Sequence, residues 1–158
     1  MNKKVLLLLM ACLVAAGLVL ASCGGTSLQE FSQKYINAEN KAWGEGDTSA
    51  LAKLEDPNVV YHMQNLGIDL TGWPAHEKII LDTRAMLSGL TQDMKYLTGE
   101  GNHWAMSYKS HSIIPGETPD KSMDVTNSSL FLFRLDKGKV VEAWVDGSTT
   151  MTPVSQGQ

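Results

Sequence analysis

Cysteine is scarce in this chain. Of the 158 residues only two are cysteines, Cys12 and Cys23, and both precede the part of the sequence with helical and strand patterns. From residue 24 onward the chain can therefore form no disulfide, offers no thiol nucleophile and cannot bind a metal through thiolates. A fold built from these residues must be stabilised by an ordinary hydrophobic core, which a chain of this length can supply.

Several motifs of common enzyme sites are missing as well. The four histidines, at positions 62, 76, 103 and 111, include no pair four residues apart, which is the spacing of a zinc site on a helix. The sequence has no G-x-S-x-G nucleophile elbow. Its stretch "TGEGN" lacks the lysine of a phosphate-binding loop. We therefore predict neither a metal nor another cofactor.

The first 23 residues have the layout of a secretory signal, with a charged start, an apolar run and small residues at the end. Leu20-Ala21-Ser22-Cys23 resembles the lipobox of bacterial lipoproteins, which implies cleavage before Cys23 and lipidation of that residue. We expect a lipoprotein signal peptide over 1–22, the lipidated cysteine and a short tether over 23–28, and one domain over 29–156. An ordinary secreted protein is the alternative. The predicted location is the bacterial cell envelope, with the domain lipid-anchored to a membrane and facing the periplasm or exterior.

The charge of the chain is acidic. Its net charge is −4, and removal of residues 1–22 would lower the number of basic residues from 13 to 11 against 17 acidic ones, giving −6. A domain with this balance is a poor partner for nucleic acid or for anionic lipid. Membrane contact is therefore expected through the lipid anchor alone.

The periodicity predicts helices first and then a series of strands. A helix over 28–43, ended by Gly44 and Gly46, is followed by a short helix through Leu51 and Leu54, a strand over 56–63 and a third helix over 71–87. Strands are predicted over 93–101, 103–113, 124–135 and 139–147, with a hairpin turn at 136–138. This order indicates an α+β fold with an antiparallel sheet.

These segments together resemble the SnoaL-like branch of the nuclear transport factor 2-like superfamily. The matching pieces are "FSQKYINAENKAWGEGD", "LEDPNVVYHM", "LTGWPAHEKI" and "FRLDKGKVVEAW". The resemblance implies a cone-shaped fold in which a curved antiparallel sheet wraps around three N-terminal helices and encloses a mostly apolar pocket. Its members include polyketide cyclases, isomerases and hydrolases, together with binding or scaffold domains without catalysis.

The strand "VVEAWVDG" carries the most distinctive pattern for a site. Glu142, Trp144 and Asp146 share one face of it, because alternate residues of a strand point to the same side. The aspartate that the resemblance implies for a cyclase falls on Ser148. Depending on the length of the turn, Glu142 would lie opposite Phe133 or Leu132. Either neighbour would desolvate the carboxylate, raise its pKa and suit it to acid–base chemistry; a structural ion pair with Arg134 or a lysine is the alternative.

The predicted catalytic residues are Glu142, Asp146 and His62. The resemblance places the histidine at the mouth of the pocket, and a half-exposed histidine at the end of its strand is the alternative. The predicted ligand-binding residues are mainly aromatic: Tyr61, Trp104, Tyr108, His111 and Trp144. Strict alternation places His111 opposite Trp104 and Tyr108, so it reaches the pocket only if a bulge intervenes. For Asp146 a role at the strand end is the alternative.

Two functions are consistent with these residues. The first is binding of a small apolar or aromatic molecule in the pocket, with acid–base chemistry of the cyclase or isomerase type on a carbonyl compound. The second is a non-catalytic interaction or scaffold module whose pocket is filled by its own aromatic side chains. Residues 130–133 and 141–145 are apolar on both faces of their hairpin, so one face needs a cover, and the resemblance implies a homodimer through that face.

Overall fold

The computed structural model describes residues 27–118 and 121–154 of the chain, so the predicted signal peptide and Cys23 lie outside the described residues. The elements in chain order are α2 (Leu28–Glu45), α3 (Leu51–Leu54), β1 (Glu55–Met63), β2 (Ile68–Thr71), α4 (Trp73–Met86), β3 (Ser88–Glu100), β4 (His103–Ile114), β5 (Met123–Asp136) and β6 (Lys139–Pro153). Within these residues no helix is both long and apolar enough to cross a membrane.

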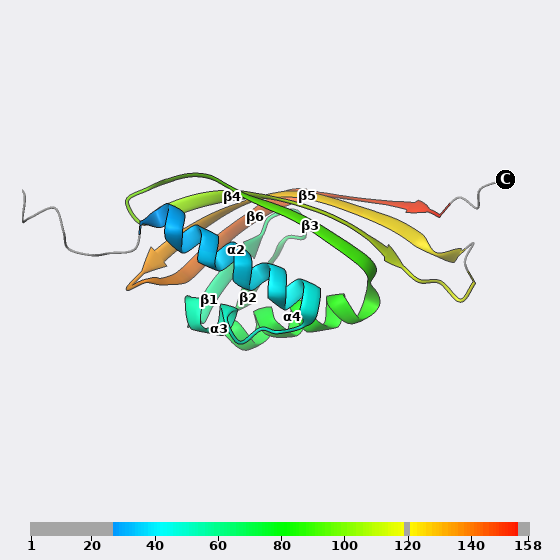
Figure 1. Cartoon of the computed structure of the whole chain (residues 1–158), viewed down its shortest axis with the longest axis horizontal. Helices are drawn as coiled ribbons and strands as arrows, with labels where there is room; N and C mark the ends of the chain where they lie inside the picture. Colours follow the sequence, from blue (N-terminus) through cyan, green and yellow to red (C-terminus); the bar gives the residue numbers. More distant parts are fainter. Residues whose placement is uncertain (1–26, 119–120, 155–158) are drawn as a thin grey trace, which may run out of the picture.

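The six strands form one curved sheet in the order β2-β1-β6-β5-β4-β3, and the three helices lie together on one side of it (Figure 1). The predicted fold class is confirmed, with one correction: β1 pairs parallel with β6, so the sheet is mixed rather than wholly antiparallel. These two strands are not joined by a hairpin, which would have forced opposite directions. The short strand β2 was not predicted.

Helix α2 begins and ends where its sequence provides caps. The Ser27 side chain accepts from the backbone N–H of Glu30, and the Glu30 carboxylate accepts from the backbone N–H of Ser27, which is a capping box. At the other end Gly46 adopts a left-handed conformation (φ 79°) and donates its N–H to the carbonyl of Ala42. These caps fix the length of α2 and therefore the position of the residues near its C-terminal end.

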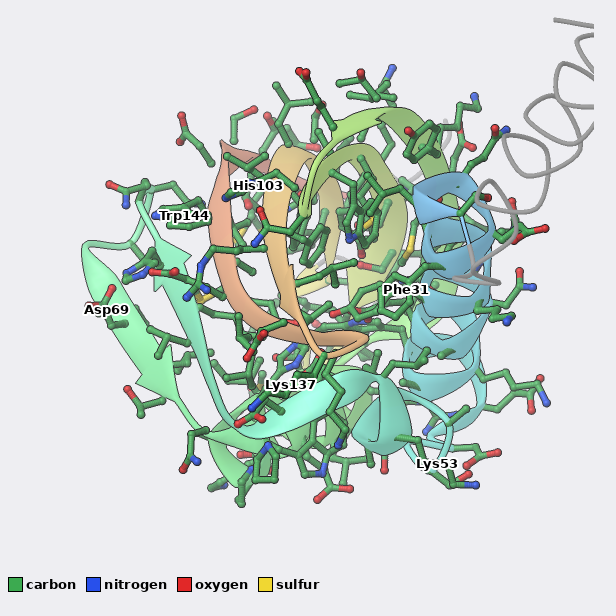
Figure 2. All side chains as sticks on the ribbon, turned by 90° about the vertical axis from the view of Figure 1, so that its left-hand side faces the viewer. Phe31, Lys53, Asp69, His103, Lys137 and Trp144 are labelled. Carbon is green, nitrogen blue, oxygen red and sulfur yellow. The ribbon has the colours of Figure 1, made fainter. Side chains whose placement is uncertain are left out.

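Two cross-strand rows distinguish the faces of the sheet. The row Tyr61, Ala143, Phe133 and Trp104 crosses β1, β6, β5 and β4 on the side of the helices, and all four side chains are buried. The next row, His62, Trp144, Leu132 and Ala105, lies on the opposite side, which we call the outer face. Figure 2 shows Phe31 between α2 and the sheet and Trp144 on the other side of the sheet.

Aromatic side chains fill the centre of the core. Trp104 stacks on Phe133 with ring centroids 4.3 Å apart, and Tyr35 of α2 meets both rings at 5.5 and 5.1 Å. Contacts of this kind stabilise a core beyond the area they bury. They hold α2 against β4 and β5.

Candidate active site

A cavity of about 330 Å³ lies between the inner face of the sheet and the helices α2 and α4. Strands β4, β5 and β6 extend beyond these helices (Figure 1), and Val125, Thr149 and Met151 line the cavity along this extension. The remaining wall is mostly aliphatic, aromatic or methionine: Met63, Leu66, Leu70, Ile79, Met94, Met106, Tyr108, Phe131 and Val145. Such a wall favours a small apolar molecule.

One end of the cavity is polar. Glu39 of α2, Tyr61 of β1 and His76 of α4 line it there, although Glu39 is only 4% and His76 only 6% exposed. Behind them Glu55, the first residue of β1, is completely buried. Three separate elements therefore bring two carboxylates and an imidazole together under an apolar wall.

Glu55 is the centre of the hydrogen-bond network at this end. Its Oε1 accepts from the hydroxyl groups of Tyr35 at 2.6 Å and Tyr61 at 2.5 Å. Nδ1 of His76 lies 3.1 Å from both carboxylate oxygens. Since a carboxylate only accepts, Nδ1 carries a proton and donates it to Glu55. Burial raises the pKa of both tyrosines well above the ordinary value, so their hydroxyl groups remain neutral donors.

Glu39 is the carboxylate that borders the cavity directly. Its Oε2 accepts a hydrogen bond from Nε1 of Trp43 at 2.9 Å. Burial raises the pKa of Glu39 from 4.5 to about 7, the negative charge of Glu55 adds to this effect, and the attraction of His76 opposes it. A carboxylate with such a pKa exchanges protons readily near neutral pH.

The pKa of His76 is raised despite its burial. Desolvation alone would lower the pKa of its imidazole, but the hydrogen bond and charge of Glu55, together with the charge of Glu39, outweigh it and raise the pKa above 6.5. Nδ1 is engaged by Glu55, and no described residue is hydrogen-bonded to Nε2. When protonated, the ring therefore has a second N–H group, on Nε2, that is available at the cavity end.

Among the described residues, one group has ligand atoms close enough together to hold a metal ion, and it consists of Glu39, Glu55 and His76. One ligand atom from each of Glu39, Glu55 and His76 lies within 4.8 Å of the others. However, Glu55 already accepts hydrogen bonds from two tyrosines and His76, and a metal would have to displace them. The donor set fits a hydrogen-bonded acid–base site better than a metal centre.

The structure separates the predicted ligand-binding residues. Tyr61 and Tyr108 line the cavity. Trp104 points to the inner side but is buried in the aromatic core and is not part of the cavity wall. His111 lies outside the cavity, is 49% exposed and pairs with Asp124 at 2.7 Å; no bulge brings it inward.

The expectation that the acidic face of β6 turns toward the pocket is wrong. Ala143 and Val145 face the core, so Glu142 and Trp144 lie on the outer face, and Asp146 borders a shallow groove there. A bulge between Arg134 and Leu135 sets Glu142 opposite Arg134, rather than opposite Phe133 or Leu132. Because the apolar residues Ala143 and Val145 pack under the helices, the alternating acidic residues of β6 must point to the opposite face.

Glu142 belongs to an ion-pair cluster on this outer face. It pairs with Arg134 at 2.8 Å and with Nε2 of His62 at 3.0 Å, while Nδ1 of His62 pairs with Asp69 at 2.9 Å. The hydrogen bond from His62 and, after it, that from Arg134 lower the pKa of Glu142, in contrast to the increase expected for a desolvated acid. The catalytic roles given to Glu142, Asp146 and His62 stay predictions, and the function proposed below does not use them.

Sequence reasoning missed Glu39, Glu55 and His76. Glu39 lies four positions after Tyr35 and therefore on the apolar stripe of its helix, where a carboxylate is a usable signal of a buried site. His76 lies four positions before Ile80 and so also shares an apolar stripe. Glu55 gave no signal, because "EDPN" is typical of an ordinary turn.

Among known proteins, the chain is similar to solved structures but not to any family model or curated sequence. No family model matches the chain, and no curated protein matches its sequence. A candidate SnoaL-like polyketide cyclase from Shewanella putrefaciens is similar with a TM-score of 0.62 and 17% identity over 77% of this chain and 91% of that chain. A protein with a ketosteroid isomerase-like fold from Catenulispora acidiphila, solved with trimethylamine, gives 0.57 and 18% identity over 72% and 84%.

A third similar structure is a nuclear transport factor 2-like protein of unknown function from Burkholderia xenovorans, with a TM-score of 0.54 and 16% identity over 84% of this chain and 91% of that chain. These similarities show that the chain has the SnoaL-like, nuclear transport factor 2-like fold that its sequence predicts. The site described above comes from the residues of this chain alone.

Proposed function

We propose that the domain binds a small, mainly apolar molecule with one polar group, and that Glu39 and His76 carry out acid–base chemistry on it. The observation that carries this proposal is the cavity of about 330 Å³, whose lining is mainly apolar and holds the ionisable side chains of Glu39, Tyr61 and His76 together at one end. The other polar side chains of the lining, such as Asn127 and Ser129, are uncharged. Convergent polar groups with shifted pKa values at one end of an apolar pocket are typical of a reactive site.

The proposed chemistry is proton transfer next to a carbonyl group. The Glu39 carboxylate takes a proton from the carbon beside the carbonyl, the electron pair of that C–H bond forms a C=C bond, and the carbonyl π electrons move to oxygen. His76 donates its Nε2–H to that oxygen and stabilises the negative charge that develops. In a carbonyl compound with a C=C bond next to the deprotonated carbon, this step gives a conjugated dienol. Return of the proton from Glu39 to the far carbon of the dienol, while the oxygen gives its proton back to His76 and the C=O bond re-forms, yields an isomer and restores both residues, so no other reactant is needed.

Binding is tested with N-phenyl-1-naphthylamine, a neutral apolar fluorophore that brightens in a dry pocket, added to the full chain. Thr83→Phe places a ring into the cavity from α4, and we expect it to weaken binding at least tenfold. Thr91→Phe adds the same ring at an exposed position of β3 outside the cavity and serves as the matched control. Equal binding by both variants would contradict a ligand site in this cavity.

Catalysis is tested with 2-tetralone in D₂O, by following loss of its α-proton signals in NMR. We expect exchange with the wild-type chain, and a loss of about 100-fold in Glu39→Gln, since the base is gone. Glu142→Gln, on the outer face, is the control and should exchange like wild type. Fluorophore binding without any exchange would support the non-catalytic binding module instead.

The anchoring of the domain is a separate proposal. We propose that the chain is a lipoprotein of the bacterial cell envelope, held to a membrane through Cys23, and the supporting feature is the lipobox-like sequence at 20–23. Mass spectrometry of the chain purified from a bacterial membrane should find an acylated N-terminus at Cys23. Cys23→Ser should release the chain from the membrane fraction, and retention of this variant would contradict the proposal.

We also propose that the domain forms a homodimer through the outer face. Leu97, Leu130 and Leu132, from β3 and β5, are 51%, 59% and 43% exposed there, and a groove lined by these residues and Trp144 lies between them. Exposed leucines gathered on one sheet face favour a protein partner. Light scattering of the chain at micromolar concentration should give twice the monomer mass.

A further inference from the structure

Glu55 has an unusual environment for a carboxylate that does not reach the cavity. It is completely buried at the junction of α3 and β1, where its backbone N–H donates to the carbonyl of Leu51. The hydroxyl oxygens of Tyr35 and Tyr61 lie 2.6 Å apart and both lie within 2.6 Å of Oε1. Three oxygens in short contact share two hydroxyl protons, which fixes the carboxylate in place.

The contacts of Glu55 lead to the cavity through His76. Both carboxylate oxygens lie 3.1 Å from Nδ1, so the imidazole is aligned along the axis of the carboxylate. The ring is further held by Tyr61, with centroids 4.0 Å apart, and by the edge-on ring of Trp73 at 5.9 Å. With Nδ1 facing Glu55, Nε2 on the far side of the ring is left for a ligand.

The titratable groups around His76 show which of them supplies negative charge to its imidazole. Helix α2 presents Glu39 and, through Glu55, Tyr35; strand β1 presents Glu55 and Tyr61; and Lys139 of β6 reaches only the backbone carbonyl of Glu55. Glu39 is neutral in much of its population near pH 7. Glu55 is therefore the main source of negative charge that can keep a buried imidazole protonated.

We propose that Glu55 is a positioning residue that orients His76 with Nε2 toward the cavity and keeps it a charged hydrogen-bond donor there. This inference deepens the proposed function and rests on it for the catalytic consequence, but its structural part can be measured without a substrate. The alternative is that Glu55 only satisfies hydrogen-bond donors in the core and does not control the protonation of His76. The two roles differ in whether the titration of His76 depends on Glu55.

The first test uses the wild-type full chain and ¹⁵N NMR of its histidine rings, with the His76 signals identified by their loss in His76→Gln. We expect His76 to be an imidazolium at pH 7 and, once neutral at higher pH, to retain its proton on Nδ1. A neutral ring at pH 7, or a neutral form protonated on Nε2, would overturn the proposal without any variant of Glu55.

The second test compares Glu55→Gln with Glu55→Asp, which restores the carboxylate. In Glu55→Gln the pKa of His76 should fall by about one unit or more, and exchange of 2-tetralone should slow about tenfold, with its decline at high pH shifted to lower pH. Glu55→Asp should recover part of both effects. A folded Glu55→Gln with the titration of wild type would overturn the proposal; if Glu55→Gln does not fold, the wild-type measurement decides.

The results separate the two proposals. If neither the wild-type chain nor any variant catalyses exchange of 2-tetralone, but the titration of His76 still depends on Glu55, the catalytic function fails and the positioning role stands. If exchange occurs and depends on His76 but is the same in Glu55→Gln, the function stands and the positioning role fails.

Discussion

The raised pKa of Glu39 has a consequence for folding that can be measured without knowing the ligand. Between pH 4.5 and about 7 the folded chain keeps a proton on Glu39 that the unfolded chain releases, so the free energy of unfolding must fall as the pH rises through this window. Glutamine at position 39 cannot ionise, so it removes this pH-dependent decrease in the free energy of unfolding. Glu39→Gln should therefore become more stable than wild type as the pH increases.

The size of the effect follows from the shift. An increase from 4.5 to about 7 corresponds to about 3 kcal/mol at a pH above both values, and the attraction to His76 is already included in it. The glutamine can still accept the hydrogen bond of Trp43 through its own carbonyl oxygen. We expect Glu39→Gln to equal wild type within about 1 kcal/mol at pH 4.5 and to exceed it by up to about 3 kcal/mol at pH 8.

The assay is urea unfolding of the full chain, followed by tryptophan fluorescence at several pH values from 4.5 to 8.5. Glu45→Gln removes an exposed carboxylate from the same helix and is the charge-matched control. The quantity of interest is the difference between Glu39→Gln and wild type, because both share the contributions of all histidines except His76, whose pKa the charge of Glu39 also raises. Parallel curves for the two proteins over the whole range would refute the burial of an ionisable Glu39 at the cavity end.

Four further changes test other parts of the structure. Ser27→Ala removes the N-cap of α2 and should lower the free energy of unfolding by about 1 kcal/mol in urea. In Gly147→Ala the new Cβ collides with the hydroxyl of Ser129 and with the backbone of Ser128 and Ser129, which should cost about 1–3 kcal/mol in the same assay. Glu142→Gln breaks a partly exposed cluster and should cost less than about 1 kcal/mol, with the loss shrinking at high salt. Leu132→Asp should turn the proposed dimer into a monomer in light scattering, and an unchanged mass in a folded variant would speak against the outer face as the interface.

The sequence predicted the order of all elements except the short strand β2, because each of the others has a local signal. Helix α2 has an apolar stripe with Phe31 and Tyr35 and ends at a glycine, and the hairpin between β5 and β6 turns at Lys137 and Gly138. The face of β6 was predicted wrongly, because Glu142, Trp144 and Asp146 alternate as cleanly as Ala143 and Val145. Alternation gives two faces but does not say which one meets the helices.

The proximity of the groups at the cavity end was beyond prediction for a different reason. Glu39, Glu55 and His76 come from α2, β1 and α4, and their proximity depends on how both helices pack across the start of β1. The strands supply most of the apolar side chains of the wall, together with uncharged polar ones such as Ser110 and Asn127, since alternating residues of a strand face the core. The two carboxylates and the imidazole of the site come instead from helix stripes and from the first residue of a strand, where buried partners can satisfy their donors and acceptors. Glu55 satisfies two tyrosines and a histidine at once. Its complete burial makes chemical sense only together with them, so the site is a property of the packed helices and sheet rather than of any one segment.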